Sequence, residues 1–126
     1  MKNMIYVFIL GIFMNFFGIV SAKTGKEIFT NYCNTCHSPT MASMFGAPPA
    51  HDQNAWEIRK SLAFQRAMEK SKFNDSDSVL KEQKIYEALL NTAKEGTVKG
   101  MPPKGTCINC TDTELLDAIK YLSSKN

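Results

Sequence analysis

The stretch Cys33-Asn34-Thr35-Cys36-His37 carries the strongest signal in the sequence. It places two thiols one helical turn apart and an imidazole directly after the second thiol. Two cysteines at this spacing can form thioether bonds to the two vinyl groups of one haem, and histidine is a common proximal ligand of haem iron. The pattern therefore predicts covalent haem attachment at Cys33 and Cys36, with His37 bound to the iron.

A Cys-x-x-Cys pair has two other common uses, as a redox dithiol and as half of a zinc site. A thioredoxin-like dithiol lies near a strand–helix unit, but no segment of this sequence alternates like a half-buried strand. A zinc-stabilised helical module would need Cys107 and Cys110, which follow Cys36 at a far longer spacing than the ~15–20 residues of a zinc ribbon. Haem attachment is therefore the favoured interpretation.

The first 22 residues have the order of a secretory signal. Lys2 precedes the apolar run Ile5 to Val20, and Val20-Ser21-Ala22 supplies the small residues of a peptidase site. The run is shorter than the ~20 apolar residues of a spanning helix, so an uncleaved membrane anchor is the weaker alternative. We expect residues 1–22 to be removed after Ala22, which leaves residues 23–126 as one exported domain.

The charge of this domain gives no reason to expect a strongly charged partner. Without Lys2, the 15 basic residues of the chain become 14, against 12 acidic residues. No run of five like charges occurs, so we expect no nucleic-acid partner. All four cysteines lie in the exported part, where thiols are oxidised unless something else holds them.

Capping signals and apolar periodicity predict an all-helical domain with long loops. The predicted helices begin at Thr24-x-x-Glu27, Asn54-x-x-Glu57, Val79 and Thr111-x-x-Glu114. Cys33 falls at the end of the first helix, and the third extends to Lys94. The segments 38–50 and 96–110 are predicted as loops because proline and glycine interrupt them. Loops of this length need something to pack around.

The iron of such a haem needs a sixth ligand unless it binds gas or reacts with substrate. The candidates are Met41, Met44, Met68, Met101 and His51. Met101-Pro102-Pro103 is favoured because two prolines restrict the backbone directly after the sulfur. We therefore predict His37 and Met101 as the axial pair, with His51 as the alternative. This pair fills both axial positions, which favours electron transfer over catalysis.

Several motifs together resemble the cytochrome c5 group of class I c-type cytochromes, over nearly the whole of residues 23–126. They are Gly25 and Phe29 before Cys-x-x-Cys-His, Gly46-Ala47-Pro48, Asp52-x-x-x-Trp56-x-x-Arg59, Met101-Pro102-Pro103-Lys104-Gly105, Cys107-x-x-Cys110 and Tyr121. The resemblance implies a small cytochrome c-like helical domain around one low-spin haem c.

The resemblance also implies roles for individual residues. The Pro48 carbonyl should accept a hydrogen bond from His37 Nδ1, a contact that orients a metal ligand. Trp56 and Arg59 should lie near the haem propionates. Cys107 and Cys110 should form a disulfide that shapes the Met101 loop.

The function implied is a periplasmic or membrane-associated electron carrier, which exchanges single electrons with donor and acceptor proteins of a respiratory chain and is not an enzyme. One alternative is the haem subunit of a periplasmic oxidoreductase. Another is a haem sensor or peroxidase-like protein with a displaceable sixth ligand.

The chain departs from the family pattern in two places, and Gly25 indicates how its first and last helices pack. His51 stands where the family usually has glycine, and the segment between Arg59 and Met101 is longer than usual, chiefly over residues 70–78. The bare backbone of Gly25 predicts that the first and last helices cross there, with Tyr121 packed beside Phe29.

Overall fold

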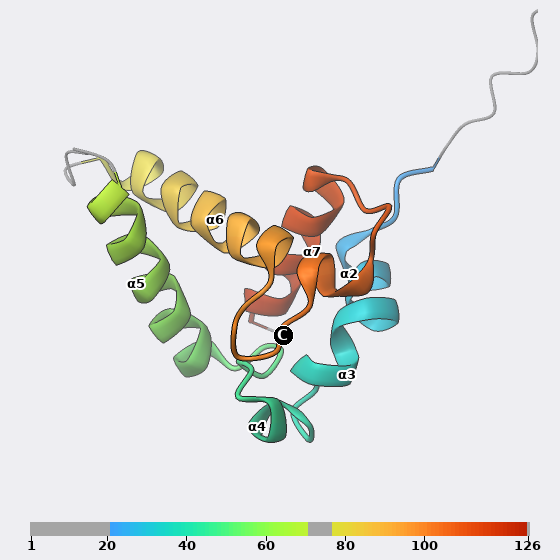
Figure 1. The fold of residues 1–126 in the computed structure, drawn as a ribbon. Helices are drawn as coiled ribbons and strands as arrows, with labels where there is room; N and C mark the ends of the chain where they lie inside the picture. The colour runs from blue at the N-terminus through green and yellow to red at the C-terminus, as the bar shows by residue number, and fades with distance from the viewer. Residues whose placement is uncertain (1–20, 71–76, 126) are drawn as a thin grey trace, which may run out of the picture.

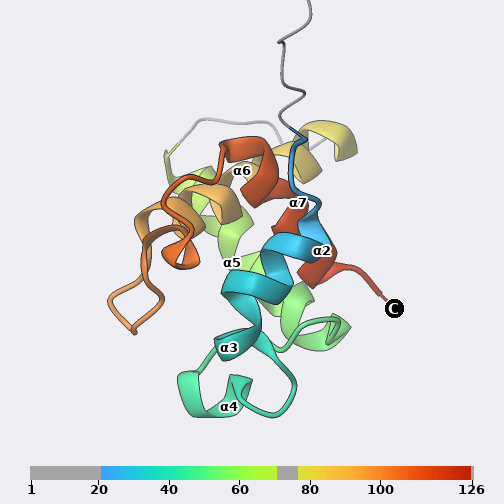
Figure 2. The same cartoon turned by 90° about the vertical axis from the view of Figure 1, so that its right-hand side faces the viewer.

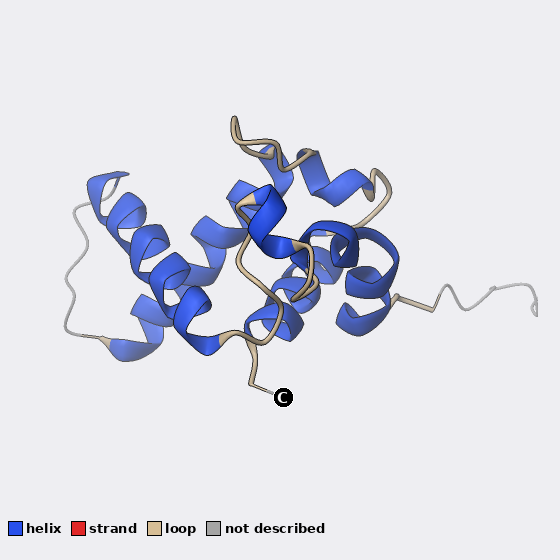
Figure 3. Cartoon of the chain, turned by 90° about the horizontal axis from the view of Figure 1, so that it is seen from below, coloured by secondary structure: helices blue, strands red, loops and turns tan. Residues whose placement is uncertain are grey.

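The computed structural model describes residues 21–70 and 77–125, which form helices joined by loops (Figure 1). No strand occurs in these two ranges (Figure 3), so the predicted all-helical class is confirmed. Most of the expected signal segment, residues 1–20, and most of the polar stretch, residues 71–76, lie outside the described residues. No helix in the described ranges is long and apolar enough to cross a membrane.

The first helix is longer than predicted. α2 (Gly25–Ile28) begins at the expected capping box, in which Thr24 and Glu27 bond each other's backbone. It continues through a π-helical turn, η1 (Phe29–Cys33), into α3 (Asn34–His37). The prediction that Cys33 ends the helix is therefore wrong. The Asn34 N–H bonds the Phe29 carbonyl, and this wider turn absorbs one residue without breaking the helix.

The last helix, α7 (Asp112–Ser123), begins at the second predicted capping box, Thr111 with Glu114. It crosses α2 as predicted (Figure 2). A Cβ on Gly25 would collide with the backbone of Asp117 and Ala118, so only glycine permits this approach. The rings of Phe29 and Tyr121 pack beside the crossing, with centroids 5.4 Å apart.

The middle of the chain forms two long helices, α5 (Gln53–Lys70) and α6 (Ser78–Glu95), which pack on each other as a V (Figure 1). α6 also packs on α7. The N-cap of α5 is Asp52, two residues before the predicted Asn54, because the Asp52 carboxylate accepts from the Ala55 N–H.

The two predicted loops each contain one short helical turn that the sequence did not suggest. α4 (Ala42–Phe45) lies in the first loop and ends at Gly46, whose φ of 61° is left-handed. The second loop contains the 3₁₀ turn η2 (Pro103–Thr106). The remainder of both loops is irregular, as predicted.

In residues 21–70 and 77–125, most of the buried apolar residues form three small clusters. The first contains Ile28, Cys107, Cys110, Leu115 and Ala118. The second contains Ala63, Leu89, Ala93 and Ile119, and the third contains Ala50, Trp56 and Leu122. Half-buried Cys33 packs against the first and third clusters, and Met101 packs against the second.

Candidate functional site

The Cys-x-x-Cys-His segment lies where the π turn passes into α3. Cys33 and Cys36 are free thiols, in contrast to Cys107 and Cys110. Burial raises the pKa of the Cys33 thiol to about 11, and the neighbouring Cys36 adds to the effect. Redox dithiols need a lowered thiol pKa. The electrostatics of Cys33 therefore oppose the thioredoxin-like alternative.

His37 is buried and has a defined tautomer. Its Nδ1 lies 2.9 Å from the Pro48 carbonyl oxygen, so the expected hydrogen bond is present. A carbonyl can only accept, which places the proton on Nδ1 and leaves the Nε2 lone pair free. Burial lowers the pKa of His37; the bond to Pro48 opposes this, and the charge of Arg59 lowers the pKa further. The result is a neutral imidazole, the form that binds metals.

The loop after α4 surrounds His37 with backbone contacts. The Ala50 N–H donates to the His37 carbonyl at 2.7 Å. Trp56 Nε1 donates to the Pro49 carbonyl at 2.9 Å, and the indole stacks on the imidazole with centroids 6.2 Å apart. Arg59 donates to the Gly46 carbonyl at 3.0 Å. Sequence reasoning missed these loop-holding contacts of Trp56 and Arg59, and their placement beside haem propionates stays a prediction.

Met101 lies in the long segment between α6 and α7, which projects from the helices as an orange loop in Figures 1 and 2. The Met101 carbonyl accepts from the Thr97 N–H at 2.9 Å, and its N–H donates to Thr97 Oγ1 at 3.2 Å. Gly96 lies so close to the Met101 carbonyl that a Cβ there would collide with it. This short turn fixes the backbone of Met101.

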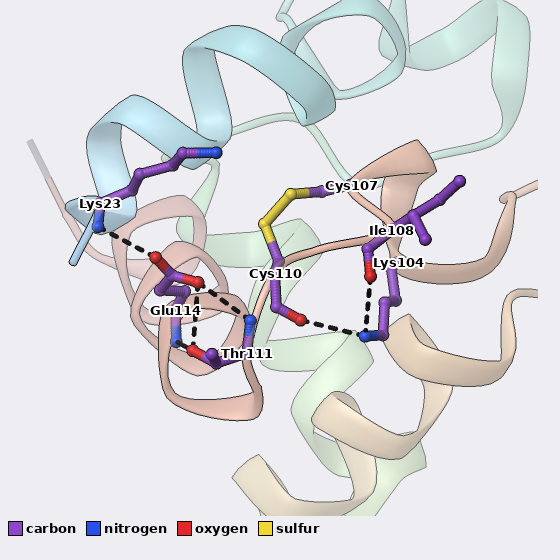
Figure 4. Close-up of a disulfide and its surroundings, with 7 residues drawn as sticks. All are labelled: Lys23, Lys104, Cys107, Ile108, Cys110, Thr111 and Glu114. Carbon is purple, nitrogen blue, oxygen red and sulfur yellow. Dashed lines mark hydrogen bonds between the residues drawn. A yellow bond between two sulfur atoms is a disulfide. The ribbon is translucent and has the colours of Figure 1, made fainter. Parts of the chain in front are cut away.

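The implied disulfide joins Cys107 to Cys110, with Cα atoms 5.4 Å apart (Figure 4). Lys104 Nζ donates to the carbonyls of Ile108 and Cys110, at 3.2 and 3.0 Å. These bonds close the loop that follows Met101. Gly105 in this loop lies close to the other cysteine pair, because a Cβ there would be 3.8 Å from Cys33 Sγ.

The other candidate iron ligands have different surroundings. His51 Nδ1 lies 2.9 Å from the Ser124 carbonyl oxygen, and its ring meets Tyr121 edge-on with centroids 4.9 Å apart. Met44 is 75% exposed on α4, and Met68 lies on α5. Met41 is half-buried just before α4. Met101 alone among these five residues combines a fixed loop backbone with packing against the second cluster.

The residues fit a covalently bound haem. Two free thiols lie on one stretch of helix, and the adjacent neutral imidazole keeps its Nε2 lone pair. Met44, Phe45, Ile58 and Leu62 are large apolar side chains that α4 and α5 leave exposed, which suits an apolar macrocycle. Fold and site together define the class of small helical proteins that hold haem through thioether bonds.

Comparison with known proteins agrees with this class. The family model described as cytochrome c oxidase, cbb3-type, subunit III matches residues 20–122. Cytochrome c5 of Ectopseudomonas mendocina is 31% identical over 102 residues, which cover 81% of this chain and 90% of that protein. Cytochrome c5 of Azotobacter vinelandii is also 31% identical over 102 residues, with 81% and 94% covered.

The chain therefore belongs to the cytochrome c family. It is an electron-transfer protein and not an enzyme, it binds haem c covalently, and its partners are redox proteins. The resemblance to cytochrome c5 that its motifs predicted is confirmed.

Proposed function

We propose that the chain is an exported monohaem cytochrome that carries single electrons between donor and acceptor proteins in the periplasm, free or bound at the membrane surface. The order of charge, apolar run and small residues in segment 1–22 supports export. The observation that carries the proposal is the neutral His37, held at Nδ1 by Pro48 beside two free thiols.

Cys33 and Cys36 would hold the haem, and His37 Nε2 and the Met101 sulfur would be its axial ligands. The bound haem supplies an iron that gains and loses one electron. The Pro48 carbonyl holds the proton of His37 on Nδ1, so the opposite nitrogen stays available as a donor. The Thr97 turn and the 107–110 disulfide support Met101 as the second ligand by fixing its loop at both ends.

Haem retention tests covalent attachment. We expect haem to stay on the polypeptide through denaturing electrophoresis and acid–acetone extraction. A variant with Cys33 and Cys36 both changed to Ser should lose it, whereas the matched variant with Cys107 and Cys110 changed to Ser should keep it. Extracted haem together with a wild-type chain of unmodified mass would refute the proposal.

The sixth ligand is tested by spectroscopy. Oxidised protein should show a weak far-red charge-transfer band from sulfur to iron, and Met101→Ala should abolish it and lower the reduction potential, because a thioether favours reduced iron. Met68→Ala is the matched control and should keep the band. Retention of the band in Met101→Ala would assign the sulfur to another methionine. Absence of the band from oxidised wild type would favour His51 as the sixth ligand. Carbon monoxide binding by reduced wild type would favour a sensor or peroxidase-like protein.

A second candidate function is that of a haem subunit in a larger oxidoreductase. The description of the matching family model, an oxidase subunit, supports it. Fractionation of the native cells separates the two candidates. A free carrier should appear in the periplasmic fraction or be released from membranes by salt. A subunit should remain with oxidase activity after detergent extraction and gel filtration.

A further inference from the structure

His51 has a backbone conformation that most side chains avoid. Its φ is 65°, in the left-handed region where glycine has no steric cost and residues with a Cβ are strained. A histidine that accepts the strain needs a compensating interaction, and the structure contains one.

That interaction is with the end of α7. The His51 N–H donates to the Leu122 carbonyl at 2.8 Å, and His51 Nδ1 donates to the Ser124 carbonyl at 2.9 Å. Between them, Gln53 Nε2 donates to the Ser123 carbonyl at 3.3 Å. The last carbonyls of a helix have no partner within the helix. His51 in the loop before α5 and Gln53 at the start of α5 therefore cap α7 from about seventy residues earlier in the chain.

The other end of the same loop holds His37. Pro48 accepts from His37 Nδ1, and Ala50, which directly precedes His51, donates to the His37 carbonyl. Ala50 is buried in the cluster of Trp56 and Leu122. Only two residues separate Pro48 from His51, so motion of His51 relative to α7 must move the carbonyl that orients the imidazole.

We infer that His51 is a positioning residue for the iron ligand: it ties the 46–51 loop to the C-terminal end of α7 and so keeps the Pro48 carbonyl on His37 Nδ1. The inference rests on the proposed role of His37. A hydrogen bond at Nδ1 makes the other nitrogen a stronger donor, which favours oxidised iron. Loosening the tether should therefore expose the His37 Nδ1–H to solvent and raise the reduction potential.

The experiment uses the haem-loaded protein and follows two readouts, the solvent exchange of the His37 Nδ1 proton by NMR and the reduction potential. His51→Gly relieves the strained φ but removes the side-chain tether. In His51→Asn, the asparagine can adopt the left-handed φ, and its side-chain amide has an N–H near the position of His51 Nδ1. Thr111→Ala is the matched control, because it removes the cap at the opposite end of the same helix.

In His51→Gly we expect the Nδ1 proton to exchange roughly tenfold faster, the factor that corresponds to about 1.4 kcal/mol, and the potential to rise. His51→Asn should restore both readouts, and Thr111→Ala should lower stability without moving either. The inference would be overturned if His51→Gly kept the exchange rate and the reduction potential of the wild type. It would also be overturned if Thr111→Ala changed both readouts as much as His51→Gly does. Failure of the proposed function is separate, since it would appear as wild-type protein without covalent haem.

Discussion

Gly25 offers the sharpest test of how the helices pack. A Cβ built on Gly25 lies 2.5 Å from the Asp117 carbonyl carbon and 2.9 Å from the Ala118 nitrogen, whereas ordinary contacts are 3.4–4 Å. The crowding atoms are backbone, so no side-chain rotation relieves them. The Asp117 carbonyl oxygen lies closer still, so Gly25→Ala must move α2 and α7 apart by about 1 Å.

The cost follows from what lies at that crossing. Ile28, Leu115 and Ala118 pack there in the first cluster, and a gap of about 0.5–1 Å forfeits a quarter to a half of each dispersion contact. Overpacking of this kind costs about 1–3 kcal/mol. We take about 3 kcal/mol for a backbone collision and subtract about 1 kcal/mol for the better helix propensity of alanine. The net loss of about 2 kcal/mol lowers Tm by about 8–16 °C in a domain of this size.

The assay is thermal unfolding of the haem-loaded protein, followed by far-UV circular dichroism and by haem absorbance. Lys26→Ala is the matched control, because Lys26 is exposed in the same turn and its replacement should change stability by less than about 0.5 kcal/mol. Adding Ala118→Gly to Gly25→Ala should not restore stability, since the colliding atoms are main chain. A Gly25→Ala variant as stable as wild type, or more stable, would refute the predicted crossing.

Three further predictions concern the rest of the domain. Phe29→Ala should cost about 2–3 kcal/mol in urea unfolding, less than the 3–5 of a fully buried ring, because Phe29 is half-buried beside Tyr121. Hydrogen bonds from the Thr111 and Lys23 backbones lower the pKa of Glu114 below 4.5, so this carboxylate stabilises the fold above pH 4.5 and loses that effect as pH falls through its folded pKa. Glu114→Gln should therefore be less stable than wild type at neutral pH, and the two stabilities should converge in acid. A constant difference between the two curves of unfolding free energy against pH would contradict this. Haem-free protein should lack a sharp thermal transition by circular dichroism, because Ile28 is the only large side chain fully buried in the described ranges.

Local signals were sufficient to predict most helices. The capping boxes at Thr24 and Thr111 involve residues three apart, so their geometry depends on neighbouring sequence alone. The predicted N-cap of α5 was wrong by two residues because Asp52 and Asn54 are both good caps, and the choice depends on the path of the preceding loop. The π turn at Phe29–Cys33 has no local signature, since its register is set by what α2 and α3 must contact on either side.

Contacts between distant segments were predictable where a family pattern supplied them or where the bare backbone of Gly25 indicated a close helix crossing. The His37–Pro48 bond and the Cys107–Cys110 disulfide followed from the resemblance to cytochrome c5. The hydrogen bond from His51 to Ser124 did not follow from the resemblance, because a histidine in a loop is usually read as an exposed residue. A glycine in the family pattern indicates a left-handed φ at position 51. It does not indicate that the side chain of His51 would bond Ser124, near the other end of the chain.

The distribution of buried residues explains why the haem-binding residues also matter for the fold. Cys33 packs against two of the three clusters and Met101 packs against the third, so the proposed haem contacts reach all three. His37 ends the helix that carries the thiols and bonds the loop that His51 ties to α7. A haem bound by these residues would add apolar contact where the protein has little of its own. The same connections that fix the ligands would then join the separate clusters into one cooperative unit, which makes haem attachment part of folding.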